Sequence, residues 1–396
     1  MELSGNRVSD RIGNQKNLIN MDKQLLSKTI DALRLPLIVG VVFIHNSSSG
    51  IPGYNLDEVL NEELWWGGVD SIIVLVSGII ASCAVPIFFF FSGYLFFRNV
   101  ENFEKKVYLA KITSRARSLL IPYLTWVCIG VVIYGLLATL PYTSHFWGNG
   151  NFSFSSNYIL ENITGLKFVD GSHTYQIGYH LWFLRDLFVM CLISPLFYWS
   201  LRSKSVWKIS ALCFLWILGI SIPYLNNWGF NSSAIIFFGL GAYFGINKMN
   251  FLMDFDKCRI LAYVSYPVLV IVDWNIRERV NSLENLPFYY EMIHASMILV
   301  ALPFWVNLTT WLIKKRYYRN WESFAAASFF IYLVHVPFIL PQVKKILYVT
   351  VKPNSQVVLL LLYLASVFLA CLIAGGIYYL MAKKCPRVLS FLTGGR

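Results

Sequence analysis

Arg34 and His45 are the residues of the first long apolar segment whose side chains could do chemistry. They lie eleven positions apart, so a helix brings them to within about 20° of the same face, with a rise of roughly 16 Å between them. Ionisable side chains inside a membrane helix cost free energy and normally face protein or a wet cavity. A snorkelling arginine and a packed histidine are each common structural features. Together, however, they place an anion-binding group near one membrane face and a proton-transfer group deeper in the bilayer.

The composition requires membrane helices to position these residues. The chain has 396 residues, of which 57% are hydrophobic and 14% are charged, whereas about a quarter of the residues in soluble domains are charged. We therefore predict an all-α fold, a polytopic membrane helical bundle of about ten transmembrane helices, with a break near Pro86 in the second. The predicted spans are 28–49, 69–97, 119–140, 181–201, 209–225, 234–246, 260–275, 292–313, 324–340 and 356–382.

The charge distribution predicts the orientation. Most of the 33 lysines and arginines fall in the tails and in alternate loops, and the positive-inside rule then places both termini in the cytoplasm. The domains expected are a disordered tail over 1–27, a transmembrane domain over 28–382 and a tail over 383–396, without a cleaved signal peptide. The net charge of +12 thus reflects topology, and no nucleic acid is expected. The seven cysteines show no metal-site spacing, and we expect neither disulfides nor a metal.

Polar residues converge in the outer half of this topology. His45 and His335 lie toward the outer ends of outgoing spans, while His180, Arg185 and Asp186 enter with the span YHLWFLRDLF. Arg185 and Asp186 lie one to two turns inside the helix end, so snorkelling does not account for them. A helix bundle should bury such groups against one another. We therefore predict that His45, His335, Arg185 and Asp186 form the catalytic group.

A cationic region is predicted at the opposite, cytoplasmic end. Arg34 is joined there by Arg98, Arg115 and Arg117, and Ser92-Gly93 suits close helix approach. A ligand that is anionic at one end and reactive at the other fits this arrangement, as acyl-coenzyme A does. His45 could take a proton from an acceptor hydroxyl or accept the acyl group itself. A nearby arginine or second histidine could stabilise the oxyanion.

At this point the motifs resemble those of the acyltransferase-3 family, integral-membrane O-acyltransferases that modify bacterial surface glycans. The arginine–ten residues–histidine signature corresponds to Arg34 and His45. Three further segments resemble family motifs in the expected order, namely VPIFFFFSGYLFFR (85–98), YHLWFL (179–184) and SFFIYLVHVPF (328–338).

This resemblance implies an acyl-CoA co-substrate, usually acetyl-CoA, with no tightly bound cofactor, and a sugar hydroxyl of a glycan or lipid-linked precursor as acceptor. Arg34 and His45 would be the essential pair, and we expect His180, Trp182 and Tyr332 to contact substrate. Many relatives carry a Glu-Glu pair where this chain reads LWFLRDL, and larger ones carry a hydrolase-like domain. The departure favours the short, stand-alone subgroup that acts on exopolysaccharide or surface-antigen intermediates.

Some alternatives stay open at this stage. Intramembrane histidine, arginine and aspartate residues also suit the proton relay of a transporter or flippase for lipid-linked sugar; the lack of a visible inverted repeat and the motif match count against it. The acyl group, the sugar and the oligomeric state are not set by the sequence. On the acceptor side, Ser47, Ser48 and Ser49 could offer a nucleophile. The aromatic residues that could stack on sugar rings are Trp65, Trp66, Phe146, Trp147, Tyr175 and Tyr179.

Overall fold

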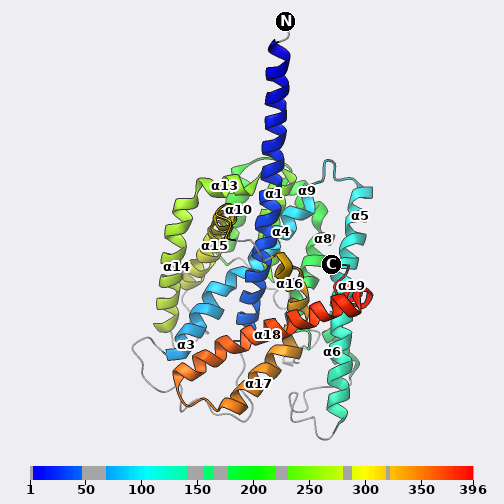
Figure 1. Ribbon diagram of the computed structural model, residues 1–396, viewed down its shortest axis with the longest axis vertical. Helices are drawn as coiled ribbons and strands as arrows, with labels where there is room; N and C mark the ends of the chain where they lie inside the picture. The colour runs from blue at the N-terminus through cyan, green and yellow to red at the C-terminus, as the bar shows by residue number, and fades with distance from the viewer. Residues whose placement is uncertain are drawn as a thin grey trace.

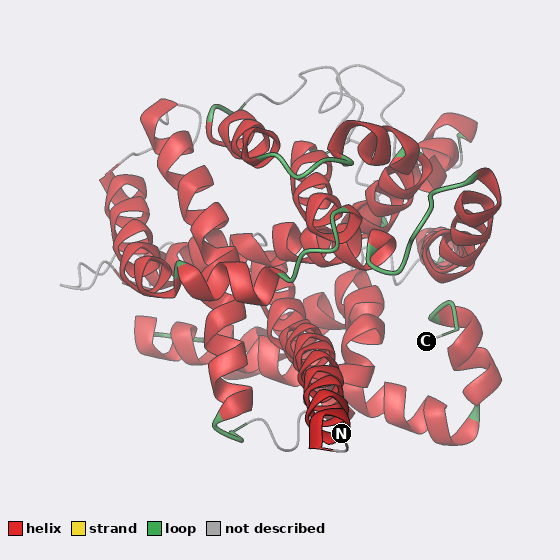
Figure 2. Ribbon diagram, turned by 90° about the horizontal axis from the view of Figure 1, so that it is seen from above, coloured by secondary structure: helices red, strands yellow, loops and turns green. Residues whose placement is uncertain are grey.

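The computed structural model describes residues 3–46, 68–140, 155–164, 177–219, 231–279, 288–317 and 322–395, with side chains in the first range from Lys23 onward. Every regular element within these ranges is a helix, and none is a strand (Figures 1 and 2). The all-α fold predicted from the sequence is therefore confirmed.

The helical segments follow one another along the chain with several π and 3-10 turns, labelled η. In order they are α1 (Leu3–Asn46), α3 (Gly68–Ile73), η1 (Val74–Ile80), η2 (Ala81–Cys83), α4 (Ala84–Phe97), α5 (Lys105–Arg115), η3 (Ala116–Leu120), α6 (Ile121–Thr139), α7 (Ser156–Thr164), η4 (Tyr179–Leu181), α8 (Trp182–Leu192), α9 (Ser194–Leu201), α10 (Val206–Ile217), α12 (Ser232–Ile246), α13 (Phe251–Lys257), α14 (Arg259–Arg279), α15 (Phe288–Lys314), α16 (Glu322–Val334), η6 (His335–Ile339), α17 (Leu340–Val351), α18 (Gln356–Lys384) and α19 (Pro386–Leu392). Thus α1 begins, and α19 lies, within the segments expected to be tails.

A multi-pass membrane protein fits the length and apolar character of these helices. Among the described residues, six segments are long and apolar enough to cross a membrane. Two bent pairs, α8 with α9 (57°) and α12 with α13 (108°), raise the number to eight if each pair is one span. A helical membrane bundle is therefore confirmed, whereas the predicted number of ten is not. The six segments are Gly68–Phe97, Lys105–Thr139, Arg259–Arg279, Phe288–Lys314, Ala325–Val351 and Gln356–Lys384.

Helix α1, which carries Arg34 and His45, runs through the middle of the bundle (Figure 1). It packs against α4, α15, α16 and α18. Its buried positions include Leu33, Leu37 and Val41, which recur every four residues as a helix that buries one stripe requires. The central position of α1 places His45 among the packed helices, whereas Arg34 is half-exposed.

Helices α4 and α12 pack at backbone contact distance, and glycines permit the approach. A Cβ added at Gly93 or at Gly241 would overlap a backbone carbonyl of the other helix, and one at Gly245 would lie 2.7 Å from the Tyr94 carbonyl oxygen. Small residues at helix interfaces allow such contacts in membrane proteins. The close approach predicted from Ser92-Gly93 is thus confirmed, and α12 is a well-packed helix in spite of its many glycines.

Irregular turns interrupt the second span before Pro86. The π turn η1 and the 3-10 turn η2 precede α4, and Pro86 has no N–H to donate to the carbonyl of Ser82. The sequence predicted a break here, and the structure shows a distorted stretch within one long helical segment.

Candidate active site

Three histidines from separate parts of the chain form the centre of the candidate site. His45 lies in the last turn of α1, His180 in η4 and His335 at the start of η6. The ring centroids of His45 and His335 are 5.2 Å apart, as are those of His180 and His335, and those of His45 and His180 are 6.4 Å apart. The sequence predicted this convergence, and the structure places the three rings together.

Backbone carbonyls determine which ring nitrogen of His180 carries the proton. The Nε2 atom lies 3.2 Å from the carbonyl oxygen of Leu333; because a carbonyl only accepts, Nε2 must donate. That carbonyl is free because Pro337, four residues later, has no N–H to bond it within the helix. The Tyr332 hydroxyl donates in return to the backbone oxygen of His180, at 2.7 Å. The proline distortion of η6 thus fixes the orientation of His180.

The same reasoning shows which ring nitrogen of His335 carries the proton. Its Nδ1 donates to the carbonyl oxygens of Tyr332, at 2.8 Å, and of Ile331, at 3.2 Å. Nδ1 of His180 and Nε2 of His335 are buried and have no hydrogen-bond partner among the described residues. Both nitrogens therefore carry lone pairs that can accept a hydrogen bond. In these tautomers neither histidine has a further N–H that could bind an oxyanion. Each ring can instead accept a hydrogen bond from a neighbouring N–H or O–H group.

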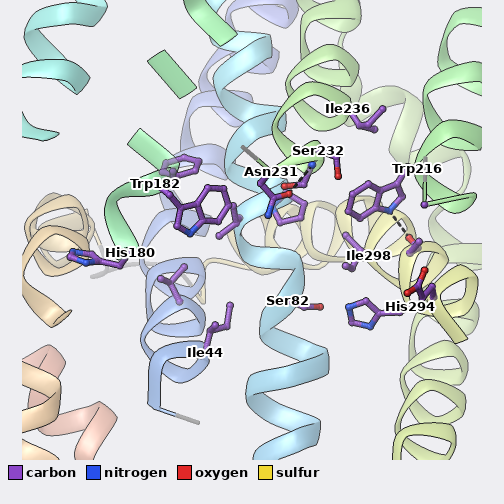
Figure 3. A pocket seen from close by; sticks show the side chains of 18 of the residues that line it. Ile44, Ser82, His180, Trp182, Trp216, Asn231, Ser232, Ile236, His294 and Ile298 are labelled. Carbon is purple, nitrogen blue, oxygen red and sulfur yellow. Dashed lines mark hydrogen bonds between the residues drawn. The ribbon is translucent and has the colours of Figure 1, made fainter. Parts of the chain in front are cut away.

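One cavity of about 570 Å³, here called the His45 cavity, opens beside this cluster. It is lined by His45, His180, Trp182 and Tyr332 among others, and its volume is in the usual range for small-ligand sites. Figure 3 shows His180 and Trp182 on one side of it. His335 does not line the cavity; its side chain is fully buried beside His45.

Arg185 and Asp186 pair with each other and do not line the His45 cavity. Their side chains are joined by contacts of 2.7 and 2.9 Å, and Asp186 is fully buried. The second carboxylate oxygen of Asp186 accepts the backbone N–H of Asn231 at 3.0 Å, just before α12, where a negative charge favours a helix start. The pair therefore ties α8 to α12.

A second cavity lies farther back along α1, toward Arg34. It has a volume of about 460 Å³ and is lined by Arg34, Arg115, Ser92 and Tyr378 among others; we call it the Arg34 cavity. Arg34 is half-exposed and forms an ion pair with Asp31 at 3.0 Å. The predicted pairing of Arg34 with Arg115 thus has a structural counterpart.

The two cavities share a wall. Val41, Val85, Phe183 and Tyr332 line both of them. Since three of these side chains are apolar and the fourth donates its hydroxyl to the His180 backbone, the wall presents a mostly apolar barrier between an arginine end and a histidine end.

The remaining predicted arginines line other hollows. Arg98 lines a cavity of about 610 Å³ with Lys23 and Lys248. Arg117 lines a surface hollow together with Arg115, beside Gly394 near the end of the described chain. Arg115 is therefore the member of the predicted cluster that shares a cavity with Arg34.

Sequence reasoning missed a second polar pair in the His45 cavity. Nδ1 of His294, on α15, lies 2.6 Å from a carboxylate oxygen of Asp273, on α14, and His294 lines the cavity. Both residues lie within predicted spans, 260–275 and 292–313, near the ends joined by an outward loop. Ionisable residues at equal depth in consecutive spans were the signal that could have revealed them.

The remaining predictions from the sequence concern the acceptor-side residues, metal ligands and cysteines. Tyr179 packs edge-on against His45, with ring centroids 5.2 Å apart. Within the described part of the chain, no group of three or more His, Cys, Asp or Glu residues has the geometry to hold a metal ion, and the seven cysteines are unpaired. The other residues suggested for acceptor contact lie outside the described residues, namely Ser47, Ser48, Ser49, Trp65, Trp66, Phe146, Trp147 and Tyr175.

Fold and site together define an integral-membrane helical protein with a histidine cluster beside one of two cavities that share a wall. The sequence matches the family described as "Acyltransferase domain", the acyltransferase-3 family, over residues 27–378. The chain belongs to this family of membrane acyltransferases. None of the curated proteins and none of the solved structures matches it.

Proposed function

We propose that this acyltransferase moves an acyl group, most simply acetyl, from cytoplasmic acyl-CoA to a hydroxyl of a cell-surface glycan or its lipid-linked precursor. The observation that carries the proposal is the pair of cavities on either side of one shared wall, with Arg34 in one and His45 in the other. The Arg34 end would face the cytoplasm of a bacterial inner membrane, and the His45 end would face outward.

The donor would bind with its phosphates at the Arg34 cavity. Arg34 and Arg115 supply two guanidinium groups there, and the planar guanidinium matches phosphate oxygens in bidentate hydrogen bonds. Arg34 would exchange its half-exposed partner Asp31 for a phosphate. An exposed ion pair is worth little, so the exchange costs little.

The acyl end of the donor would reach the histidines across the shared wall. Val41, Val85 and Phe183 present apolar surface on that route, which suits the methyl group of an acetyl thioester and limits water. Excluding water from the thioester protects it from hydrolysis and strengthens the electrostatic interactions around it.

His45 would carry out the chemistry in one of two ways. As general base, it takes the proton of the acceptor hydroxyl while the hydroxyl oxygen attacks the thioester carbonyl carbon and the CoA thiolate departs. As acyl acceptor, its nitrogen attacks that carbon first and the CoA thiolate departs. The hydroxyl oxygen then attacks the acyl carbon, the carbon–nitrogen bond breaks, and the released imidazole takes up the hydroxyl proton. In either case His45 has an N–H to donate at some stage, and the acceptor nitrogens of His180 and His335 lie on neighbouring rings.

The proposal is tested with inverted membrane vesicles that contain the protein, supplied with radiolabelled acetyl-CoA on the exposed cytoplasmic face. We expect label in the glycan or glycolipid fraction, and none in vesicles without the protein. Absence of label together with protein-dependent movement of lipid-linked sugar would replace the proposal with a transporter.

A further inference from the structure

His294, which is paired with the buried Asp273, lies on a different wall of the His45 cavity from the histidine cluster. Figure 3 shows His294 and Trp216 on one side and His180 and Ile44 on the other. His294 comes from α15, and Asp273 comes from the adjacent α14. The cavity therefore has two separate groups of proton-accepting side chains.

The geometry of the pair sets the tautomer of His294. A carboxylate only accepts hydrogen bonds, so Nδ1 of His294 donates to Asp273 across their 2.6 Å contact. The other nitrogen, Nε2, then carries a lone pair, and no described residue bonds it. The His294 side chain is 24% exposed while that of Asp273 is fully buried, which is the arrangement of an aspartate that orients a histidine base.

A purely structural link is the competing explanation of this pair. A buried carboxylate within a membrane helix is costly, and α14 and α15 also contact through aromatic rings, with Tyr266 and Phe304 centroids 4.4 Å apart. The two helices therefore have apolar packing of their own. A link between helices would also not require the imidazole to line a cavity.

The surroundings of His294 suit a polyhydroxylated molecule. The Trp216 ring is held by a hydrogen bond from Nε1 to the Ala295 carbonyl oxygen, at 2.9 Å, and lines the cavity with Glu291 and Asn231. Rigid aromatic surfaces beside a few polar groups are typical of small-molecule sites, and a sugar ring offers both an apolar face and hydroxyl groups.

The geometry points to Asp273 and His294 as a second acid–base dyad, one that serves the acceptor hydroxyl in the acyl transfer proposed above, on which this inference rests. Nε2 of His294 accepts the hydroxyl proton as the oxygen forms its bond to the acyl carbon. The bond from that carbon to its carrier, the CoA sulfur or a His45 nitrogen, breaks, and its electron pair leaves with the carrier. The proton then passes from His294 to the departing group or to water. His45 then acts on the acyl group, as its carrier or as an N–H donor to its carbonyl oxygen.

The test compares variants of the full-length protein in lipid nanodiscs, with acetyl-CoA as donor and octyl β-D-glucoside or water as acceptor. Released CoA thiol reports total turnover, mass spectrometry reports acetylated glucoside, and calorimetry reports acetyl-CoA binding. His294→Gln keeps an N–H donor for Asp273 but has no basic nitrogen, and His294→Ala removes both. Ser296→Ala is the matched control, since Ser296 bonds only the Met292 carbonyl of its own helix among the described residues.

If His294 is a base, His294→Gln and His294→Ala should both reduce turnover by about 100-fold or more. Their acetyl-CoA binding should stay within about twofold of wild type, and Ser296→Ala should behave like wild type in both measurements. If the pair is only a structural link, His294→Gln should instead turn over like wild type. That outcome overturns the dyad but leaves the proposed function standing. Wild-type protein that neither binds acetyl-CoA nor releases CoA overturns the proposed function, and the dyad's role with it.

Discussion

The Arg34 cavity leads to a prediction about donor affinity that can be quantified. We expect Arg34→Ala to weaken acetyl-CoA binding by about 5- to 30-fold. A hydrogen bond to a charged group contributes about 1.5–3 kcal/mol, and the half-exposed ion pair with Asp31 that the donor must displace is worth about 0–1 kcal/mol. The difference is roughly 1–2 kcal/mol, and each 1.4 kcal/mol corresponds to a factor of about ten in Kd.

The same ion pair predicts an opposite effect at its other member. Asp31→Ala frees Arg34 and removes the negative charge paired with it, so acetyl-CoA should bind more tightly, by up to about fivefold. This gain should shrink at high salt because exposed charges are screened.

Calorimetric titration of the purified protein with acetyl-CoA measures both effects, and Arg98→Ala is the matched control. Arg98 is another arginine of the predicted cationic region but lines a different cavity, so its removal should change Kd by less than about twofold. Equal losses in Arg34→Ala and Arg98→Ala, or a loss in Arg98→Ala alone, would refute the assignment of the donor to the Arg34 cavity.

Three further predictions concern packing and the route between the cavities. Gly241→Ala should lower the melting temperature, since its Cβ would overlap the Phe90 carbonyl and overpacking costs about 1–3 kcal/mol; an unchanged value would contradict the close packing of α4 and α12. Asp186→Ala should also destabilise, by about 3–5 kcal/mol, because it leaves Arg185 buried without this carboxylate; thermal unfolding that matches wild type would argue against this tie. Val85→Trp should fill the shared wall and reduce CoA release at least tenfold with acetyl-CoA binding retained; unimpaired release would place the acyl route elsewhere.

Sequence reasoning recovered separation along a helix better than position around the bundle axis. The spacing of Arg34 and His45 fixed their separation along one helix, and the structure places them in two cavities that share a wall. Depth alone also grouped Arg185 and Asp186 with His45. Which way a side chain points depends on helix rotation and neighbours, and Asp186 instead faces the start of α12.

The same limit explains the distribution of the arginines and the missed pair. Arg98 and Arg115 share a predicted depth, yet the C-terminal ends of α4 and α5 direct them into different cavities. Asp273 and His294 are isolated polar residues in two spans, and only the packing of α14 against α15 brings them into contact. Tertiary packing therefore supplied what periodicity and charge could not.

The most direct test of the account is the turnover of His45→Ala beside its acetyl-CoA affinity. We predict that CoA release falls by at least about 100-fold, whereas Kd stays within about twofold of wild type because His45 does not line the Arg34 cavity. A folded His45→Ala protein that releases CoA at the wild-type rate would contradict the central role of this histidine in the transfer.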